Sequence, residues 1–195
     1  LGTDQIIIKG NDDIKIDNIE YDIIPDRIEA GTFLIAVAAV GGELDILNCN
    51  PNHLEIIVNL LKDVGCDISI GSNSIKINST EKIKAINMET LEYPGFPTDL
   101  QAQWMALMCI ADGVSTIKEN IYNDRFTHIA ELSRFGAEIS LKENIATITG
   151  VEHLYGAPVM STDIRASASL IIAALMSEGE SSISRIYHID RGYED

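Results

Sequence analysis

Three aspartates stand at the entrances of three apolar segments, where each could be a helix cap or a catalytic carboxylate. Asp26, Asp99 and Asp163 each precede a run of mostly apolar residues. Such an aspartate normally accepts hydrogen bonds from the free N–H groups of the first helical turn. It could also act as a general base, with a pKa that the helix N-terminus lowers and burial raises. The residues leave both roles open, although three copies of one local pattern favour capping.

Three of the six arginines lie at helix entries. Arg125 precedes an amphipathic segment, Arg165 falls in the first turn of the third apolar segment, and Arg191 occupies the place that corresponds to Arg125. Backbone N–H groups at a helix entry, together with guanidinium groups, bind phosphate or carboxylate. The alternative is a salt bridge to the preceding acid, Asp124 or Asp190. An anion site and simple ion pairs therefore both remain open.

Histidines, cysteines and glycines give no sign of metal, thiol or nucleotide-loop chemistry. The four histidines lack metal-ligand spacing, so we expect them at the surface or in satisfied polar contacts. The three cysteines form no CxxC pair and are expected to be free structural thiols in a reducing, cytoplasmic compartment. Neither a P-loop nor a dinucleotide-binding glycine motif is present. The sequence therefore predicts an activity that uses no metal and no cofactor.

Composition limits the partners of the chain. The 195 residues are 46% hydrophobic and carry a net charge of −16. This charge argues against nucleic acid or an anionic membrane as a general partner, because no basic excess is present to release counterions. The longest apolar runs are about a dozen residues, short of the roughly 20 that span a bilayer. A small anionic ligand remains possible, because a few arginines can be concentrated locally.

The elements around these residues follow a repeat. Each apolar segment is expected to form a buried helix that opens at an aspartate and ends at Gly42, Gly113 or Gly179. The middle helix is expected over residues 100–111, with Thr98 or Asp99 as its cap. Short strands follow at residues 44–47, 115–118 and 181–184. The spacing of the three glycines gives a period of about 70 residues.

The first two repeats continue in the same way. Each has an amphipathic helix and then a hairpin, at residues 66–78 and 137–149, whose strands alternate isoleucine with polar residues. We expect one α/β (α+β) domain over residues 1–195, with repeated βαβαββ units at about 1–78, 79–149 and 150–195. Small mixed sheets would wrap the buried helices, and the third unit would be incomplete. The chain is therefore expected to be a piece of a longer protein.

Five motifs, in order along nearly the whole chain, resemble one enzyme family. They are PDRIEAGT (25–32), FPTDLQAQ (96–103), NDRFTH (123–128), DIRASASL (163–170) and RIYHIDRGYE (185–194). They are similar to the UDP-N-acetylglucosamine 1-carboxyvinyltransferases, enolpyruvyl transferases that catalyse the first committed step of peptidoglycan synthesis. The related enolpyruvyl transferases of the shikimate pathway share the repeat but not the FPTDLQAQ motif. The resemblance implies a two-domain fold, each domain an inside-out α/β barrel with its helices inside.

The resemblance also implies an activity and roles for individual residues. The family moves the enolpyruvyl group of phosphoenolpyruvate onto the 3-hydroxyl of UDP-N-acetylglucosamine, releasing phosphate through a tetrahedral intermediate. Asp99 matches the aspartate that contacts this hydroxyl and is the proposed base. Ile121 matches a position whose backbone contacts the UDP-sugar, and Arg191 matches an arginine that binds phosphoenolpyruvate. Arg125 and Arg165 match arginines that line the same cleft.

The resemblance covers only the second domain of the family. The first domain, with its reactive-cysteine loop and its Lys-Asn pair, has no counterpart here, and none of the three cysteines matches the loop cysteine. The expected partners are therefore the two substrates and the missing first domain, and the isolated chain is expected to be inactive. The alternative is a non-catalytic binding module, or a nucleic-acid-end-processing relative like the RNA 3′-terminal phosphate cyclases, which use related units.

Overall fold

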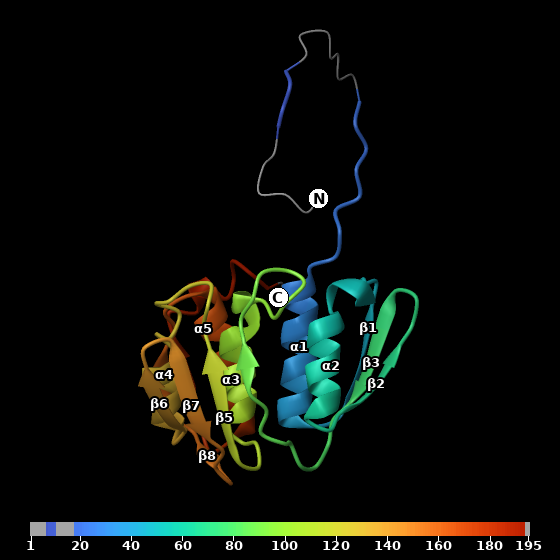
Figure 1. Ribbon diagram of the computed structural model, residues 1–195. Coiled ribbons are helices and arrows are strands. Elements are labelled where there is room, and N and C mark those ends of the chain that lie inside the picture. Colours follow the sequence, from blue (N-terminus) through green and yellow to red (C-terminus); the bar gives the residue numbers. More distant parts are fainter. Residues whose placement is uncertain (1–6, 11–17, 194–195) are drawn as a thin grey trace.

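Three apolar helices form the centre of the structure. The computed structural model describes residues 7–10 and 18–193. Helices α1 (Arg27–Val40), α3 (Gln101–Met108) and α5 (Ile164–Met176) contact one another, and Figure 1 shows the strands outside them. All eight residues of α3 are buried. A helix that is apolar on every face has no side to present to water, so its neighbours must enclose it.

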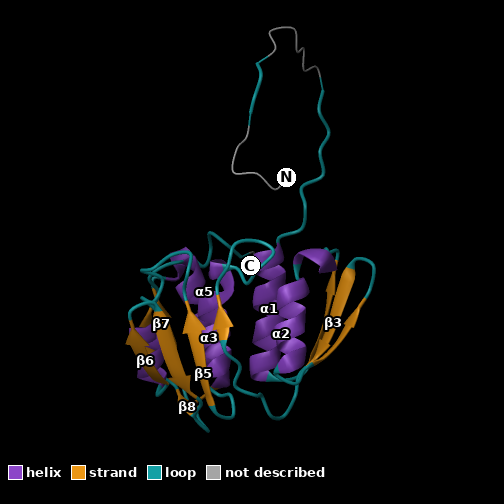
Figure 2. Cartoon of the chain, viewed as in Figure 1, coloured by secondary structure: helices purple, strands orange, loops and turns teal. Residues whose placement is uncertain are grey.

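Two antiparallel-rich sheets cover this core (Figure 2). The first has the order β1-β3-β2, with β1 (Glu43–Leu47), β2 (Asp67–Ile70) and β3 (Ser74–Asn78). The second has the order β4-β5-β7-β6, with β4 (Met88–Glu89), β5 (Val114–Lys118), β6 (Glu138–Lys142) and β7 (Ile145–Thr149). In the two sheets, strands β3 and β7 bury alternate residues, which gives each sheet an apolar inner face.

The third group of strands is smaller. Strands β8 (Leu154–Tyr155) and β9 (Pro158–Met160) pair in parallel with β10 (Ser177–Glu178) and β11 (Ser182–Ser184) respectively. Strands β4 and β5 are also parallel. A parallel pair on either side of a buried helix is the crossover arrangement expected of a β-helix-β unit.

Two further helices lie between the core and the hairpins. Helix α2 (Glu55–Asp63) buries Ile57, Val58 and Leu61. Helix α4 (Ile129–Leu132) is only one turn long and continues as a 3₁₀ turn over Ser133–Phe135. The helix–strand–helix–hairpin order therefore occurs twice along the chain.

The strands and hairpins begin and end within one residue or so of the predicted positions, but two predictions are wrong. The middle helix ends at Met108 rather than at residue 111, since the N–H of Ala111 bonds to Met108 in a tighter turn. The second amphipathic helix is present as α4 and its 3₁₀ turn, which end at Gly136. The first unit has no opening strand in residues 7–10 and 18–26; the rest of that predicted region lies outside the described residues.

The N-terminal ends of the three core helices meet at one end of the molecule. Asp26 and Glu29 at the start of α1 line a cavity of about 460 Å³ together with Ile164 and Arg165 of α5. Arg165 also reaches Asp99, just before α3. Because helix dipoles are positive at this end, the shared edge favours negative charge.

None of the helices in the described residues combines the length and hydropathy that crossing a membrane requires.

Candidate active site

Two of the three repeated aspartates cap their helices, as predicted. Asp26 Oδ1 accepts hydrogen bonds from the backbone N–H groups of Ile28 (2.7 Å) and Glu29 (3.3 Å). Asp163 Oδ1 accepts in the same way from Arg165 (2.9 Å) and Ala166 (3.0 Å). Both residues have extended backbone, the usual geometry of an N-cap. Their carboxylates are therefore occupied by the helices that they begin.

Asp99 does not cap a helix, so the capping prediction is wrong for this copy. It lies within a 3₁₀ turn (Thr98–Leu100) that leads into α3, and no side chain caps either helix. Its Oδ1 instead accepts a hydrogen bond from Arg125 Nη1 at 2.6 Å and lies 3.4 Å from Arg165 Nε. Two guanidinium groups are stronger partners for a carboxylate than neutral N–H groups. Asp99 thus differs from Asp26 and Asp163 in its partners, which are arginine side chains and not the N–H groups of a helix.

The environment of Asp99 sets its charge. Partial burial raises the pKa of Asp99, but the hydrogen bond from Arg125 and the charges of Arg165 and Arg125 together hold it below its ordinary value. The side chain is 38% exposed. Asp99 is therefore an ionised carboxylate that an incoming molecule can reach.

Arg125 and Arg165 open onto a cavity of about 550 Å³. Arg191 also lines this cavity, so the structure brings together the three arginines singled out from the sequence. The remaining lining residues are Tyr122, Asp124, Thr127, Asp163, Ile164 and His188. This volume is in the range of sites for small organic ligands. Three guanidinium groups and the N-terminus of α5, against the two carboxylates of Asp124 and Asp163, make it a candidate site for an anion.

The alternative prediction, in which Arg125 and Arg191 pair with the acids that precede them, is not what the structure shows. Arg125 pairs with Asp99 rather than with Asp124. Within residues 7–10 and 18–193, Arg191 forms no ion pair with Asp190. Ile121 does not line the cavity, although its neighbour Tyr122 does.

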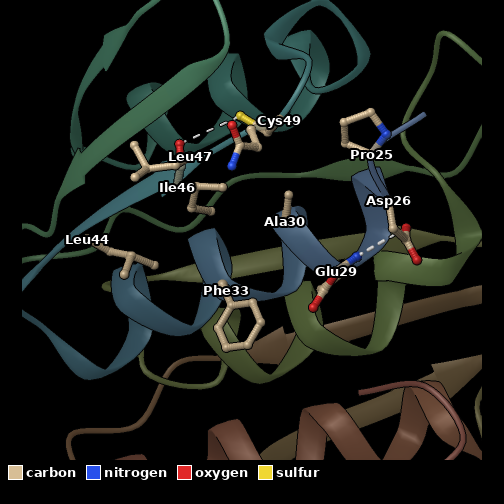
Figure 3. Close-up of a pocket in the computed structure, with 10 residues that line it drawn as sticks. Pro25, Asp26, Glu29, Ala30, Phe33, Leu44, Ile46, Leu47 and Cys49 are labelled. Carbon is tan, nitrogen blue, oxygen red and sulfur yellow. Dashed lines mark hydrogen bonds between the residues drawn. The ribbon is translucent and has the colours of Figure 1, made fainter. Parts of the chain in front are cut away.

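The hollow beside Asp26 has a different character. Figure 3 shows this cavity of about 500 Å³ between α1 and β1, with Phe33 and Leu44 among the apolar side chains that line it. Its only charged lining residues are Asp26 and Glu29, and Cys49 lies at its edge. Two carboxylates without a cation repel an anion. This hollow is therefore not suited to a phosphate-bearing molecule, in contrast to the two cavities that Arg165 and Arg191 line.

Comparison with known protein families shows which family this chain belongs to. The family model of EPSP synthase (3-phosphoshikimate 1-carboxyvinyltransferase) matches residues 2–195. The chain belongs to this family. Its curated relatives include proteins named UDP-N-acetylglucosamine 1-carboxyvinyltransferase. The one from Geotalea daltonii is 52% identical over 191 residues, and the one from Geobacter metallireducens is 51% identical over 193 residues.

The alignments cover 95% and 99% of this chain but 46% of each relative. The chain thus spans about half the length of the curated relatives it matches. Solved structures of the EPSP synthase family have the same fold. The enolpyruvyl transferase NikO from Streptomyces tendae has a TM-score of 0.80 at 25% identity, over 88% of this chain and 41% of its own. EPSP synthase from Acinetobacter baumannii has a TM-score of 0.70 at 20% identity, over 88% and 43%.

One residue of this EPSP synthase-family chain that sequence reasoning missed is Glu119. It follows β5, is fully buried, and accepts hydrogen bonds from Thr90, Thr98, Ile121 and Tyr122. A single glutamate in a polar turn carries no periodicity and no motif. The only available signal was its place between a strand and the segment that leads to Arg125.

His128 contradicts the expectation that all four histidines are exposed or satisfied. It is 2% exposed, and its Nε2 has no hydrogen-bond partner. Burial lowers the pKa of His128 to about 4, while the charge of Asp163 raises it and that of Arg125 lowers it. The imidazole is therefore neutral at pH 7 beside two groups of the site.

The cysteines are all free and buried. Burial raises the pKa of Cys49 and Cys66, and that of Cys109 to about 12. All three therefore stay as unreactive thiols at neutral pH. In the part of the chain that the structure describes, no group of three His, Cys, Asp or Glu side chains could hold a metal ion.

Proposed function

We propose that this chain is the substrate-binding half of a UDP-N-acetylglucosamine 1-carboxyvinyltransferase. The complete enzyme would transfer the enolpyruvyl group of phosphoenolpyruvate to the 3-hydroxyl of UDP-N-acetylglucosamine, in the first committed step of peptidoglycan synthesis. The main observation behind the proposal is that the carboxylate of Asp99 does not cap a helix. Alone among the three equivalent aspartates, its carboxylate is held by two arginines, and both of these arginines line the cavity of about 550 Å³.

Asp99 would accept the proton of the 3-hydroxyl as the sugar oxygen forms its bond to C2 of phosphoenolpyruvate. A group outside this chain would protonate C3 and take the proton back as phosphate leaves C2, and the departing phosphate would take up the proton held by Asp99. Arg125, Arg165 and Arg191 would bind the anionic groups of the substrates. The backbone of Ile121, beside the cavity residue Tyr122, would contact the UDP-sugar.

The low pKa of Asp99 fits this role only if its arginines move when substrate binds. While both guanidinium groups hold the carboxylate, Asp99 is a weak base. A bound phosphate would compete for Arg125 and Arg165, because both anions use the same donors. Losing these partners would raise the pKa of Asp99 at the moment when the hydroxyl must be deprotonated.

The remaining wall of the site would come from a second domain. The curated relatives are about twice as long as this chain. We infer that residues 1–195 form one domain of an inside-out barrel type, that the enzyme is cytoplasmic and uses no cofactor, and that the isolated chain has no turnover.

A chimera tests the proposal. The 195 residues replace the matching 46% of the Geotalea daltonii relative, and phosphate release is measured with both substrates. Activity is expected, and Asp99→Asn should lower kcat by about 10²–10⁴-fold, the usual contribution of a general base. Asp26→Asn is the matched control, because asparagine also caps helices and should leave kcat nearly unchanged.

Two results would contradict the proposal. A folded chimera without phosphate release would reject the activity. A loss in Asp26→Asn equal to that in Asp99→Asn would reject Asp99 as the base.

A further inference from the structure

Glu119 is a buried carboxylate that the proposed reaction does not use. Both of its oxygens are acceptors. Oε1 accepts from Thr90 Oγ1 (2.6 Å) and from the backbone N–H groups of Ile121 (2.9 Å) and Tyr122 (3.0 Å), and Oε2 accepts from Thr98 Oγ1 (2.9 Å). Its exposed fraction is 0%. Burying a carboxylate is costly unless hydrogen bonds replace its water, so four donors converging on one side chain form a defined structural node.

The node joins the two segments that carry the Asp99–Arg125 pair. On one side, Thr98 is the residue immediately before Asp99 in the 3₁₀ turn. On the other side, Tyr122 begins the turn that presents Arg125, whose N–H donates to the Tyr122 carbonyl at 3.0 Å. The Arg125 guanidinium also lies over the Tyr122 ring, 5.5 Å from its centre.

Few other side chains could make this connection. A carboxylate offers about four acceptor positions, whereas an amide offers two and a hydroxyl two. An apolar residue would leave both segments without these bonds, and a glutamine could keep them only by donating to one hydroxyl and accepting at a single oxygen. The remaining contacts of the segment, such as Asn144 Nδ2 to the Glu119 carbonyl (2.8 Å), fix the strand end and not Asp99.

We propose that Glu119 is a positioning residue that sets the distance between Asp99 and Arg125 by fixing the Thr98 turn and the Tyr122 turn together. It touches neither substrate nor cavity. The proposal rests on the proposed function only where it concerns turnover; the placement of the Asp99–Arg125 pair is a property of this chain alone.

The first test measures the pKa of Asp99 in the 195-residue chain by carbon-detected NMR titration. In Glu119→Ala the pKa should rise, because Arg125 is no longer held against the carboxylate. Removing a nearby negative charge without moving Arg125 would change the pKa in the opposite direction, downward. A rise therefore supports positioning, and a fall or no change overturns it.

A second variant guards against misfolding. Thr98→Val removes one of the four hydrogen bonds and keeps the shape of the side chain, and it should also raise the pKa of Asp99. Glu131→Ala is the matched control, because Glu131 also accepts a backbone N–H, that of Met160 (2.9 Å), and does not contact the site. If Glu119→Ala does not fold, Thr98→Val against Glu131→Ala decides the outcome.

The chimera allows a kinetic test of the same proposal. Misplacing a reacting group by about 1 Å costs about 10²-fold in rate, so Thr98→Val should lower kcat with little change in KM for UDP-N-acetylglucosamine. Equal changes in kcat and KM, or a loss matched by Glu131→Ala, would indicate a merely structural role. An inactive parent chimera would reject the proposed function, while the NMR result would still decide the role of Glu119.

Discussion

The burial of His128 predicts a specific loss of stability on acidification. Its ordinary pKa of 6.5 applies to the unfolded chain, whereas burial lowers the pKa of His128 in the folded chain to about 4. Between these values the unfolded chain binds a proton that the folded chain does not. Stability is therefore complete above pH 6.5 and is lost as the pH falls toward 4.

The magnitude follows from the size of this difference. Each unit of pKa difference corresponds to about 1.4 kcal/mol, so the contribution of His128 falls by about 1.4 kcal/mol at pH 5.5 and about 3 kcal/mol at pH 4. His128 is 2% exposed, so solvent screening reduces this value little. The neighbouring charges, Asp163 and Arg125, act in opposite directions.

Urea unfolding at pH 7, 5.5 and 4 measures the effect, with His128→Leu as the comparison. The 30 aspartates and glutamates also titrate at low pH, but they do so in both proteins. The free energy of unfolding should therefore fall by about 3 kcal/mol more in the wild type than in the variant. Parallel pH profiles for the two proteins would refute the argument, whatever the cost of the substitution at pH 7.

Two further predictions concern the fold. Asp163→Ala should lower the free energy of unfolding by about 1 kcal/mol, whereas Asp163→Ser should retain most of it as an alternative cap; equal losses in urea unfolding would show that the cap contributes nothing. Gly150→Ala should destabilise the chain by about 3 kcal/mol or prevent folding, because a Cβ at this position would overlap the backbone carbonyl of Ala111. Gly10→Ala is the control, since none of the residues that the structure describes lies within 4 Å of that position, and a Gly150→Ala protein as stable as this control would contradict the prediction.

Local sequence patterns were sufficient for most of the fold. Alternating isoleucines located the hairpins, and the all-round apolar segments located the three core helices, because these patterns reflect burial directly. The ends of the middle helix were predicted less well. There the backbone changes to 3₁₀ turns, and this change depends on neighbouring segments rather than on the residues in the turn.

Local sequence patterns likewise predicted only part of the candidate site. Spacing identified Asp99, Arg125, Arg165 and Arg191, but it gave Asp99 the same capping role as its two copies. What distinguishes Asp99 is the approach of Arg125, a residue 26 positions away in the chain. The hydrogen bonds of Glu119 with Thr90 and Thr98 span similar separations. Pairings of this kind exist only once the strands have formed, so no local pattern could reveal them.

The enclosure of α3 has a consequence for the dynamics of the molecule. Since every residue of this helix is buried, its backbone amides can exchange with solvent only when the core itself opens, and their exchange should report the global stability. The partly exposed side chains of Asp99 and Arg125 lie on turns just outside it. The charged groups of the site thus lie at the edge of the core, while the helix that they adjoin stays closed until the whole chain unfolds.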